Sequence, residues 1–402
     1  SRGLGDVYKR QRPDYSNAWL LSGVTSATPV RGTVALTPSM VSPYITWEKV
    51  DNANLGFDLM LLKNRLSLTA DFYQRTTRDM IGPAESIPSI SGIASDDRAK
   101  VNNATLRNRG WELSVSWNDK LKCGFSYGVG FNVFNYKAVV TKYNNPEGII
   151  YNNHTGLAAN KGYYEGMDIG EIWGYVTDRF YREDDFNADG TLKEGIPIPK
   201  GVGKVYPGDI LYKNFDDDAS TIWSGKGTAD DPGDQRIIGN STPRFHYGIN
   251  AGLSWKGFDL SVFLRGVGKR DFWRTDQIAW PTGTWGSLFK ETLDFWTPEH
   301  TDAYFPRVYA NNGVNTASNR WKQTKYLANA AYLKLQNITL SYTLPKTWAK
   351  QICFDEVKVF FSGENLHTWD HLPEGLESDM LSKGAWEYPF MKKFSLGFNV
   401  TF

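Results

Sequence analysis

The residues best suited to binding chemistry lie between positions 271 and 321, where indole rings alternate with charged and amide side chains. Aromatic faces flanked by polar groups suit sugar rings, and the same combination anchors protein partners. The predicted contacts for a ligand or for a protein that covers it are Trp273, Trp280, Trp285 and Trp321. The alternative is that these rings pack the segment against neighbouring parts of the chain.

Two oxygen-rich loops are the second chemical signal. Asn214, Asp216 and Asp218 alternate along one loop, and carboxylate and amide oxygens are ligands that Ca²⁺ accepts. Residues 185–196 begin like the calcium loop of an EF-hand, but Ile196 occupies the position of the closing glutamate. We interpret both as solvated loops, with Ca²⁺ at the first as the alternative, and we predict no other cofactor.

The residues do not form a convincing catalytic set. Asp58 and Glu112 take inward positions on expected strands, and a pair of carboxyls is what glycoside hydrolysis requires. Acidic residues are common, however, and no H-E-x-x-H zinc motif occurs. Cys123 and Cys353 lie far apart, with no His or Cys nearby at metal-ligand spacing. We therefore predict that the chain is not an enzyme and assign it no catalytic residue.

Composition limits the possible partners. The net charge of +1 creates no general field for nucleic acid or anionic lipid, so we expect no nucleic-acid partner. No stretch approaches eighteen uncharged apolar residues, which excludes a transmembrane helix. A mean hydropathy of −0.46 agrees with a β-barrel that has a polar lumen and long wet loops.

The elements that must position these residues are strands with one apolar face. In the last strand, residues 391–402, apolar side chains alternate with small or polar ones, which is the period of a strand. Its length suits a tilted crossing of an outer membrane. The end of this strand, Phe398, Val400 and Phe402, resembles the signal that outer-membrane barrels present to their insertion machinery. An edge strand of a soluble sandwich is the alternative.

Four hairpins repeat this pattern and give about nine strands with the last one. The strand pairs are 53–61 with 66–73, 111–117 with 127–133, 245–255 with 258–264, and 331–343 with 356–366. The alternation slips by one residue at Asn337, which predicts a β-bulge. In this register the polar, lumen-lining face carries His246, Asn250, Asp259 and Arg265.

The connections between these strands alternate in length. Tight turns are expected at 62–65, 118–122 and 256–257, and long loops at 80–104, 138–243, 271–330 and 367–389. This asymmetry is typical of membrane barrels. The predicted fold is therefore all-β: a transmembrane antiparallel β-barrel, present here as a partial barrel, with short periplasmic turns and long extracellular loops.

The chain divides into three parts in this interpretation. Residues 1–11 contain Asp6 to Gln11, which matches the translation of a transposase end used in sequencing libraries, so we interpret them as a non-native artefact. Residues 12–43 are a loop or strand remnant. Residues 44–402 form the carboxy-terminal part of the barrel.

Several short motifs follow one another along the chain in an order that is typical of a known family. They are Trp47-Glu48 followed by Asn54, Gly56 and Asp58; Ile172-Trp173-Gly174-Tyr175 followed by Pro207-Gly208-Asp209; Gly239, Pro243, Phe245, Tyr247 and Gly248; residues 331–340; and residues 362–366. In their order and spacing the chain, from about Tyr44 to Phe402, resembles the carboxy-terminal part of SusC/RagA-type TonB-dependent transporters.

The resemblance implies a multi-pass barrel in the outer membrane of a Gram-negative cell. It implies import of a glycan under a SusD-like surface lipoprotein that acts as a lid. It also implies energy from TonB, ExbB and ExbD, acting through a plug that would precede residue 12. Peptide import of the RagA type is one alternative. A secreted or surface glycan-binding β-protein without transport is the other.

Overall fold

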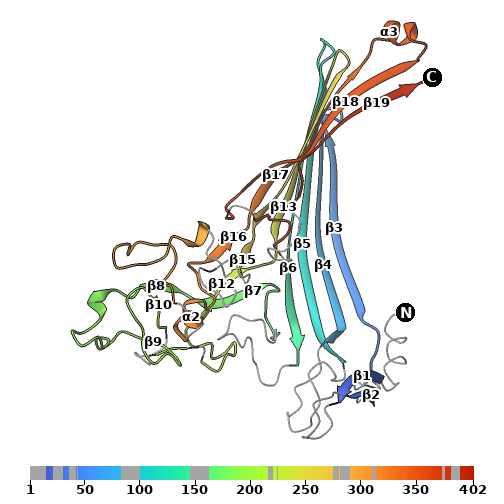
Figure 1. Cartoon of the computed structure of the whole chain (residues 1–402). Coiled ribbons are helices and arrows are strands. Elements are labelled where there is room, and N and C mark those ends of the chain that lie inside the picture. The colour runs from blue at the N-terminus through green and yellow to red at the C-terminus, as the bar shows by residue number, and fades with distance from the viewer. Residues whose placement is uncertain are drawn as a thin grey trace.

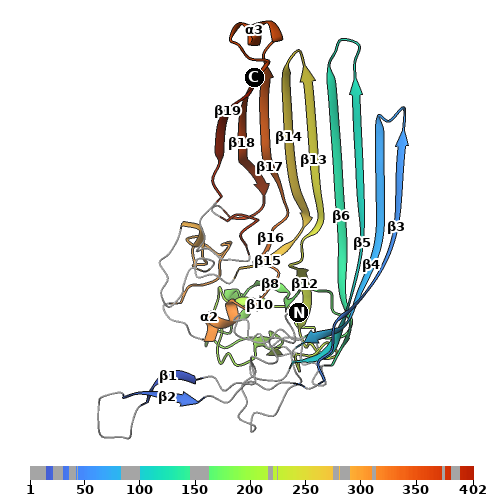
Figure 2. The same cartoon turned by 90° about the vertical axis from the view of Figure 1, so that its right-hand side faces the viewer.

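The structure is a computed structural model that describes residues 15–20, 30–35, 42, 44–82, 100–144, 163–215, 221–223, 225–274, 280, 290–309, 314–373, 376–381 and 390–402. Within these residues, nine strands form one antiparallel sheet in which each strand pairs with its neighbours in chain order. Figures 1 and 2 show the strands side by side. They are β3 (Lys49–Leu61), β4 (Leu66–Gly82), β5 (Val101–Lys120), β6 (Ser126–Tyr143), β13 (Arg244–Trp255), β14 (Phe258–Lys269), β17 (Tyr332–Thr343), β18 (Glu356–Asp370) and β19 (Lys393–Thr401).

One face of this sheet is apolar, because paired residues of neighbouring strands point to the same side. A row of directly paired residues crosses all nine strands: Leu61, Leu66, Trp117, Val129, Ala251, Val262, Ile338, Gly363 and Phe394. We call this side the apolar face. The side chains of Leu396 and Phe398 are each 68% exposed on it. An apolar surface of this extent is suited to lipid.

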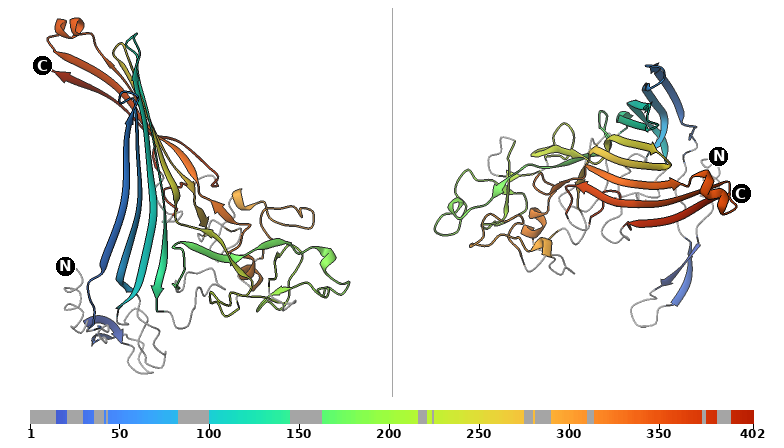
Figure 3. Two further views of the ribbon diagram at one scale, coloured as in Figure 1. Left: turned by 180° about the vertical axis from the view of Figure 1, so that it is seen from behind. Right: turned by 90° about the horizontal axis from the view of Figure 1, so that it is seen from above.

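The opposite side is the polar face. A row of paired residues across eight strands consists of Asp58, Thr69, Ser114, Asn132, Gly248, Arg265, Lys334 and Thr368. A hollow of about 1380 Å³ opens on this face near the tight turns. Viewed from above, the sheet is curved like a segment of a barrel wall (Figure 3). The predicted sorting of side chains by face is confirmed.

The tight turns gather at one end of the sheet and the long connections at the other (Figure 1). Lys256 and Gly257 have φ values of 48° and 87°, the positive pair of a two-residue type I′ hairpin turn. A Cβ at Gly257 would lie 2.7 Å from the carbonyl oxygen of Thr343, so the turn requires glycine there. The helix α3 (Lys346–Gln351) fills the connection from β17 to β18.

The predicted bulge is present. The register of β17 shifts between Leu335 and Asn337 against β18, and correspondingly between Phe263 and Leu264 of β14. Gln336 is the extra residue against β14, whereas against β18 it faces two residues, Asn365 and Leu366. The bulge keeps the apolar side chains on one face on both sides of it. A second bulge, between Thr77 and Met80 of β4, was not expected from the alternation pattern.

The long connections fold into a lobe beside the loop end of the sheet (Figure 1). Its short strands pair as β7 with β12, β8 with β10, β9 with β11, and β15 with β16. They are β7 (Glu171–Tyr175), β8 (Thr177–Phe180), β9 (Ile198–Pro199), β10 (Ile210–Tyr212), β11 (Thr221–Ile222), β12 (Gln235–Asn240), β15 (Asp271–Trp273) and β16 (Leu327–Asn329). The lobe also contains η3 (Glu183–Asp185), η5 (Lys290–Thr292) and α2 (Val314–Asn319). A separate hairpin joins β1 (Tyr15–Leu20) and β2 (Val30–Ala35).

The packed core of the described residues lies in this lobe and not against the sheet. One cluster brings together Tyr175, Tyr212 and Trp321, whose rings stack with centroids 4.8 and 5.8 Å from Trp321. A second cluster surrounds Tyr181 and Leu211. Rings from two distant connections thus hold the lobe together. No helix in the described part of the chain has both the length and the apolar character that a membrane span requires.

A charge on the apolar face should destabilise the intact barrel. We expect Val262→Arg to lower the free energy of unfolding in phospholipid vesicles by about 2–4 kcal/mol, because Val262 lies in the middle of the apolar row. Ser261→Arg, one residue away on the polar face, is the matched control and should change it little. Guanidinium titration checks both. Equal effects would contradict the assignment of the faces.

Candidate functional site

A pocket of about 370 Å³ opens in the lobe where four chain segments meet. Trp273 of β15 and the adjacent Arg274 form one side, and Trp280 stands beside them. The lining residues are Trp273, Arg274, Trp280, Tyr304, Phe305, Tyr326, Leu327, Ala328, Asn329, His371 and Pro373. The last two follow β18, so the connection from β18 to β19 supplies one wall. We call this the aromatic pocket.

Edge-to-face contacts fix the rings of the aromatic pocket. The Trp280 centroid lies 4.9 Å from that of Tyr326 in an edge-to-face contact and 6.1 Å from that of Trp273 in a tilted one. The Tyr326 hydroxyl donates a hydrogen bond to the carbonyl oxygen of Tyr304 at 2.7 Å. Burial raises the pKa of both tyrosine hydroxyls, so they remain protonated at neutral pH. Such a pocket offers flat apolar surfaces that are held in place before a ligand arrives.

Two positively charged side chains lie close to these rings. The Arg320 guanidinium lies 5.9 Å from the Trp280 centroid, and the Lys325 ammonium lies 5.6 Å from the Tyr304 centroid. Burial lowers the pKa of each cation. No Asp or Glu is among the described lining residues. The pocket thus combines aromatic faces, a lining arginine and an amide, which suits a ring that carries hydroxyl groups.

The four predicted tryptophans differ in their surroundings in the structure. Trp321 is only 3% exposed and stacks inside the lobe core, so it serves packing. Trp273 is 8% exposed and joins the same core at the pocket side. Trp280 is partly exposed and lines the pocket. Trp285 lies outside the described residues. The contact with ligand or lid stays a prediction, with Trp280 as its best-placed residue.

The four residues predicted to line the lumen all lie on strands β13 and β14 and share the polar face. His246 stacks on Phe134 at a centroid distance of 4.6 Å. Asn250 and Asp259 line the hollow near the turns, where Asp259 accepts a hydrogen bond from Lys358 at 3.1 Å. Arg265 lies farther toward the loops and belongs to a different group of contacts.

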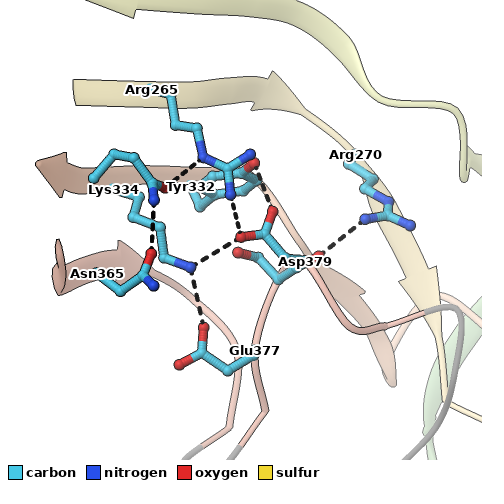
Figure 4. A network of polar contacts seen from close by, with 9 residues as sticks. Arg265, Arg270, Tyr332, Lys334, Asn365, Glu377 and Asp379 are labelled. Atoms are coloured by element: carbon cyan, nitrogen blue, oxygen red, sulfur yellow. Dashed lines mark hydrogen bonds and ion pairs between the residues drawn. The ribbon is translucent and has the colours of Figure 1, made fainter. Parts of the chain in front are cut away.

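Arg265 is part of a polar network on the polar face (Figure 4). Its guanidinium donates to Asp379 at 2.6 Å, and Lys334 donates to the same oxygen at 2.9 Å. Burial raises the pKa of Asp379, but Lys334 and Arg265 outweigh burial and hold it below its usual range. The sequence motifs did not point to Lys334 and Asp379 as an ion pair. One signal could have found it: Lys334 and Arg265 pair directly on one face of neighbouring strands, and two adjacent like charges require a nearby anion.

The structure describes little of the candidate calcium loop. Asn214 is described, while Asp216 and Asp218 lie outside the described residues. In the EF-hand-like loop, Asp185 accepts from both terminal nitrogens of Arg179, at 2.5 and 2.8 Å. Its oxygens therefore serve an ion pair. No three His, Cys, Asp or Glu side chains gather as metal ligands anywhere in the described ranges.

The P-G-D motif builds the lobe. Buried Asp209 accepts hydrogen bonds from the Tyr309 hydroxyl and the Asn319 amide, each at 2.8 Å. Gly208 has a φ of 92°, and a Cβ there would lie 2.3 Å from the ring of Trp296. The charge of Asp209 and burial raise the pKa of the Tyr309 hydroxyl, with burial the larger cause. The motif therefore ties the connection before β13 to the one before β17.

Two features that could suggest hydrolysis have structural explanations. Asp58 accepts a hydrogen bond from the Thr69 hydroxyl at 2.7 Å on exposed neighbouring strands. Residues 124–128 match the pattern G-x-S-x-G, so the expectation that the chain has no such motif was wrong. They form a turn that enters β6, whereas a nucleophile elbow requires a turn from a strand into a helix.

Removing the Asp209 carboxylate should loosen the lobe. We expect Asp209→Ala to destabilise it by about 2–4 kcal/mol, because each buried donor left without a partner costs about 1–3 kcal/mol. Asp178→Ala, at an exposed position of β8, is the matched control. The measurement is the rate at which an added protease cleaves the lobe of each variant in intact cells. Equal cleavage rates would show that Asp209 does not hold the connections together.

The Arg179–Asp185 pair should make the lobe sensitive to acid. Burial raises the pKa of Asp185, but Arg179 and the Arg182 backbone outweigh it, and the pKa lies below the usual value. The pair therefore stabilises the lobe above about pH 4 and loses this effect as pH falls through the lowered pKa. Arg179→Met removes the pair and lets the pKa of Asp185 rise, so acid should loosen the lobe at a higher pH, seen as cleavage by pepsin at a higher pH than in the unmodified protein. Exposed Arg182→Met should shift that pH much less.

The comparisons with known proteins agree with this architecture. The family model described as "TonB dependent receptor-like, beta-barrel" matches residues 8–366. TonB-dependent receptor P3 of Formosa agariphila is 24% identical over 376 residues, covering 89% of this chain and 34% of the relative. TonB-dependent receptor SusC of Bacteroides thetaiotaomicron is 20% identical over 326 residues, covering 78% of this chain and 28% of the relative.

Solved structures give the same fold. The structure of the RagAB peptide transporter matches with a TM-score of 0.65 and 21% identity, over 96% of this chain and 39% of that chain. The chain thus spans about a third of the length of the curated relatives it matches. The nine-stranded sheet is part of a transmembrane antiparallel β-barrel with short periplasmic turns and long extracellular loops. The chain belongs to the family of TonB-dependent receptor-like β-barrels and is, within it, SusC/RagA-like.

Proposed function

We propose that the protein imports an oligosaccharide across the outer membrane in a TonB-dependent cycle, and that the aromatic pocket contacts this cargo. The observation that carries the proposal is the place of the pocket. It lies in the lobe at the loop end of the sheet, on the extracellular side of a wall whose apolar face suits lipid. A ligand that arrives from outside reaches this position before it reaches the lumen.

The chemistry of the pocket supports a sugar over other cargo. Sugar rings have flat C–H faces that pack on aromatic side chains and hydroxyl edges that need hydrogen-bond partners. Trp280, Tyr304 and Tyr326 supply the faces, while Arg274 and Asn329 supply polar groups. The described lining contains no group pair arranged for bond cleavage. Binding without chemistry fits a transporter, and we propose no enzymatic activity.

Peptide import is the second candidate. RagAB is described as a peptide transporter, and its likeness to this chain concerns the fold. Aromatic and arginine side chains also anchor peptides. A surface glycan-binding protein without transport is less well supported, because it does not need lipid-facing rows across nine strands.

We also propose the partners that such a cycle requires. A SusD-like lipoprotein would cover the lobe as a lid, and TonB with ExbB and ExbD would supply energy through a plug. The barrel insertion machinery would recognise the last strand, where β19 exposes Phe398 and Phe402 follows it. Ca²⁺ at Asn214, Asp216 and Asp218 remains a weaker proposal. The domain limits at residues 11 and 43 also stay predictions.

Trp280→Ala tests the role of the pocket. We expect the affinity of the intact transporter for its oligosaccharide to fall about tenfold, since one aromatic contact contributes about 1–1.5 kcal/mol. Trp348→Ala, in α3 at the turn end, is the matched control and should leave affinity unchanged. Binding and uptake are measured with a panel of fluorescently labelled oligosaccharides and hexapeptides.

The panel also decides between the cargo classes. Uptake of oligosaccharides alone, lost with Trp280→Ala, supports the proposal. Uptake of hexapeptides alone would replace it with the peptide alternative. Binding without uptake would favour the surface glycan-binding protein.

A further inference from the structure

The barrel wall contains a buried cation, Lys334, which is shielded from water and therefore needs an anionic partner within the protein. Lys334 of β17 is 2% exposed and is the only buried lysine or arginine among the described residues. It pairs directly with Arg265 of β14 on the polar face. Two like charges side by side on neighbouring strands repel each other, and a buried charge is costly without a partner. The wall therefore needs negative charge at this point.

The connection from β18 to β19 supplies it. One Asp379 oxygen accepts from Lys334 at 2.9 Å and from Arg265 at 2.6 Å, and the other accepts from the Tyr332 hydroxyl at 3.0 Å. The Glu377 carboxylate lies 3.6 Å from the Lys334 ammonium. Two cations of the wall thus face two anions of one connection (Figure 4). We call these residues the ionic anchor.

The backbone between the two acids is held as well. Arg270, which follows β14, donates to the carbonyl oxygen of Ser378 at 3.1 Å and to that of Ser241 at 3.3 Å. Ser378 is fully buried, and Leu381 is buried just beyond it. Three consecutive residues, 377 to 379, are therefore held by side chains of β14, of β17 and of Arg270, which directly follows β14. This short segment cannot move without breaking several charged contacts together.

The same connection lines the aromatic pocket. His371 and Pro373 form one wall of the pocket and precede Glu377 by only a few residues. The backbone N–H of Leu376 donates to the carbonyl oxygen of Pro373 at 3.2 Å, so a direct hydrogen bond ties the pocket wall to the residue that precedes the anchored segment. Trp273 and Leu327, which also line the pocket, belong to the β15–β16 pair.

We propose that the ionic anchor of Lys334, Arg265, Glu377 and Asp379 is a positioning device that fastens the β18–β19 connection to the barrel wall and thereby holds His371 and Pro373 as one wall of the aromatic pocket. The anchor residues touch no cargo. They act through the connection they hold. The use of the pocket for cargo rests on the proposed function, whereas the mechanical link between anchor and pocket wall does not.

A spin label at His371→Cys tests this link without any ligand. The intact transporter, with exposed Cys123 and Cys353 and any cysteine outside this chain changed to serine, is labelled in membranes, and the spectrum reports the motion of the pocket wall. We expect Asp379→Asn to convert an immobilised spectrum into a mobile one, because two wall cations lose their shared partner. Lys334→Met, on strand β17 of the wall, should also make the spectrum mobile.

Glu364→Gln is the matched control, because Glu364 of β18 pairs at 3.7 Å with Lys393 in an exposed ion pair. It should leave the spectrum unchanged. A heat-modifiable gel band confirms that each variant barrel is folded. Folded Asp379→Asn and Lys334→Met proteins with the immobilised wild-type spectrum would overturn the proposal.

A transport measurement then separates the anchor from the proposed function. For a labelled probe whose uptake depends on Trp280, Asp379→Asn should raise the apparent KM at least threefold and change the maximal rate less than twofold. An unchanged KM together with a mobile label would show that the anchor holds the wall but that the pocket does not bind cargo, which overturns the proposed site. An immobile label overturns the anchor whatever the cargo is.

Discussion

The whole structure depends on one constraint: the backbone of a strand that crosses lipid must find all its hydrogen-bond partners in neighbouring strands. Within the described residues seven of the nine strands meet it on both sides by pairing in chain order, whereas β3 and β19 each pair on one side. Period-two alternation then gives the sheet an apolar face and a polar face. Because lipid takes the place of a core on the apolar face, the packed core of the chain lies in the lobe.

The polar face has its own requirement. Lys334, which is buried, and Arg265 bring two positive charges together on the wall, and a carboxylate beside them compensates the repulsion and the cost of burying Lys334. Asp379 does so and in this way draws the connection after β18 onto the wall. A strand pattern thus determines where a loop lies, and the loop in turn completes a pocket in the lobe.

The lobe shows how long loops become a defined surface. Stacked rings from the connections before β13 and before β17 share one core, and Asp209 joins them through hydrogen bonds to residues 100 or more positions away in sequence. Some of the aromatic residues are therefore structural. Trp321 supports the core, whereas Trp280 stands at the edge of the core where a ligand can reach its ring.

Local sequence is enough to predict that these strands exist, which faces they have and where the bulge near Asn337 lies, because these follow from alternation along a single stretch of chain. The strand ends are predicted less well, since β5 runs from Val101 to Lys120 where 111–117 was expected, and the turn expected at 118–122 begins only after Lys120. Local sequence also indicates the family, through motifs whose order is a property of the chain alone. Which tryptophans are buried and which line a pocket depends on tertiary structure, because burial is set by what a distant segment places over each ring. The same holds for the pairing of Asp379 with Lys334, since two charges that lie 45 residues apart meet only after the loop has folded back onto the wall.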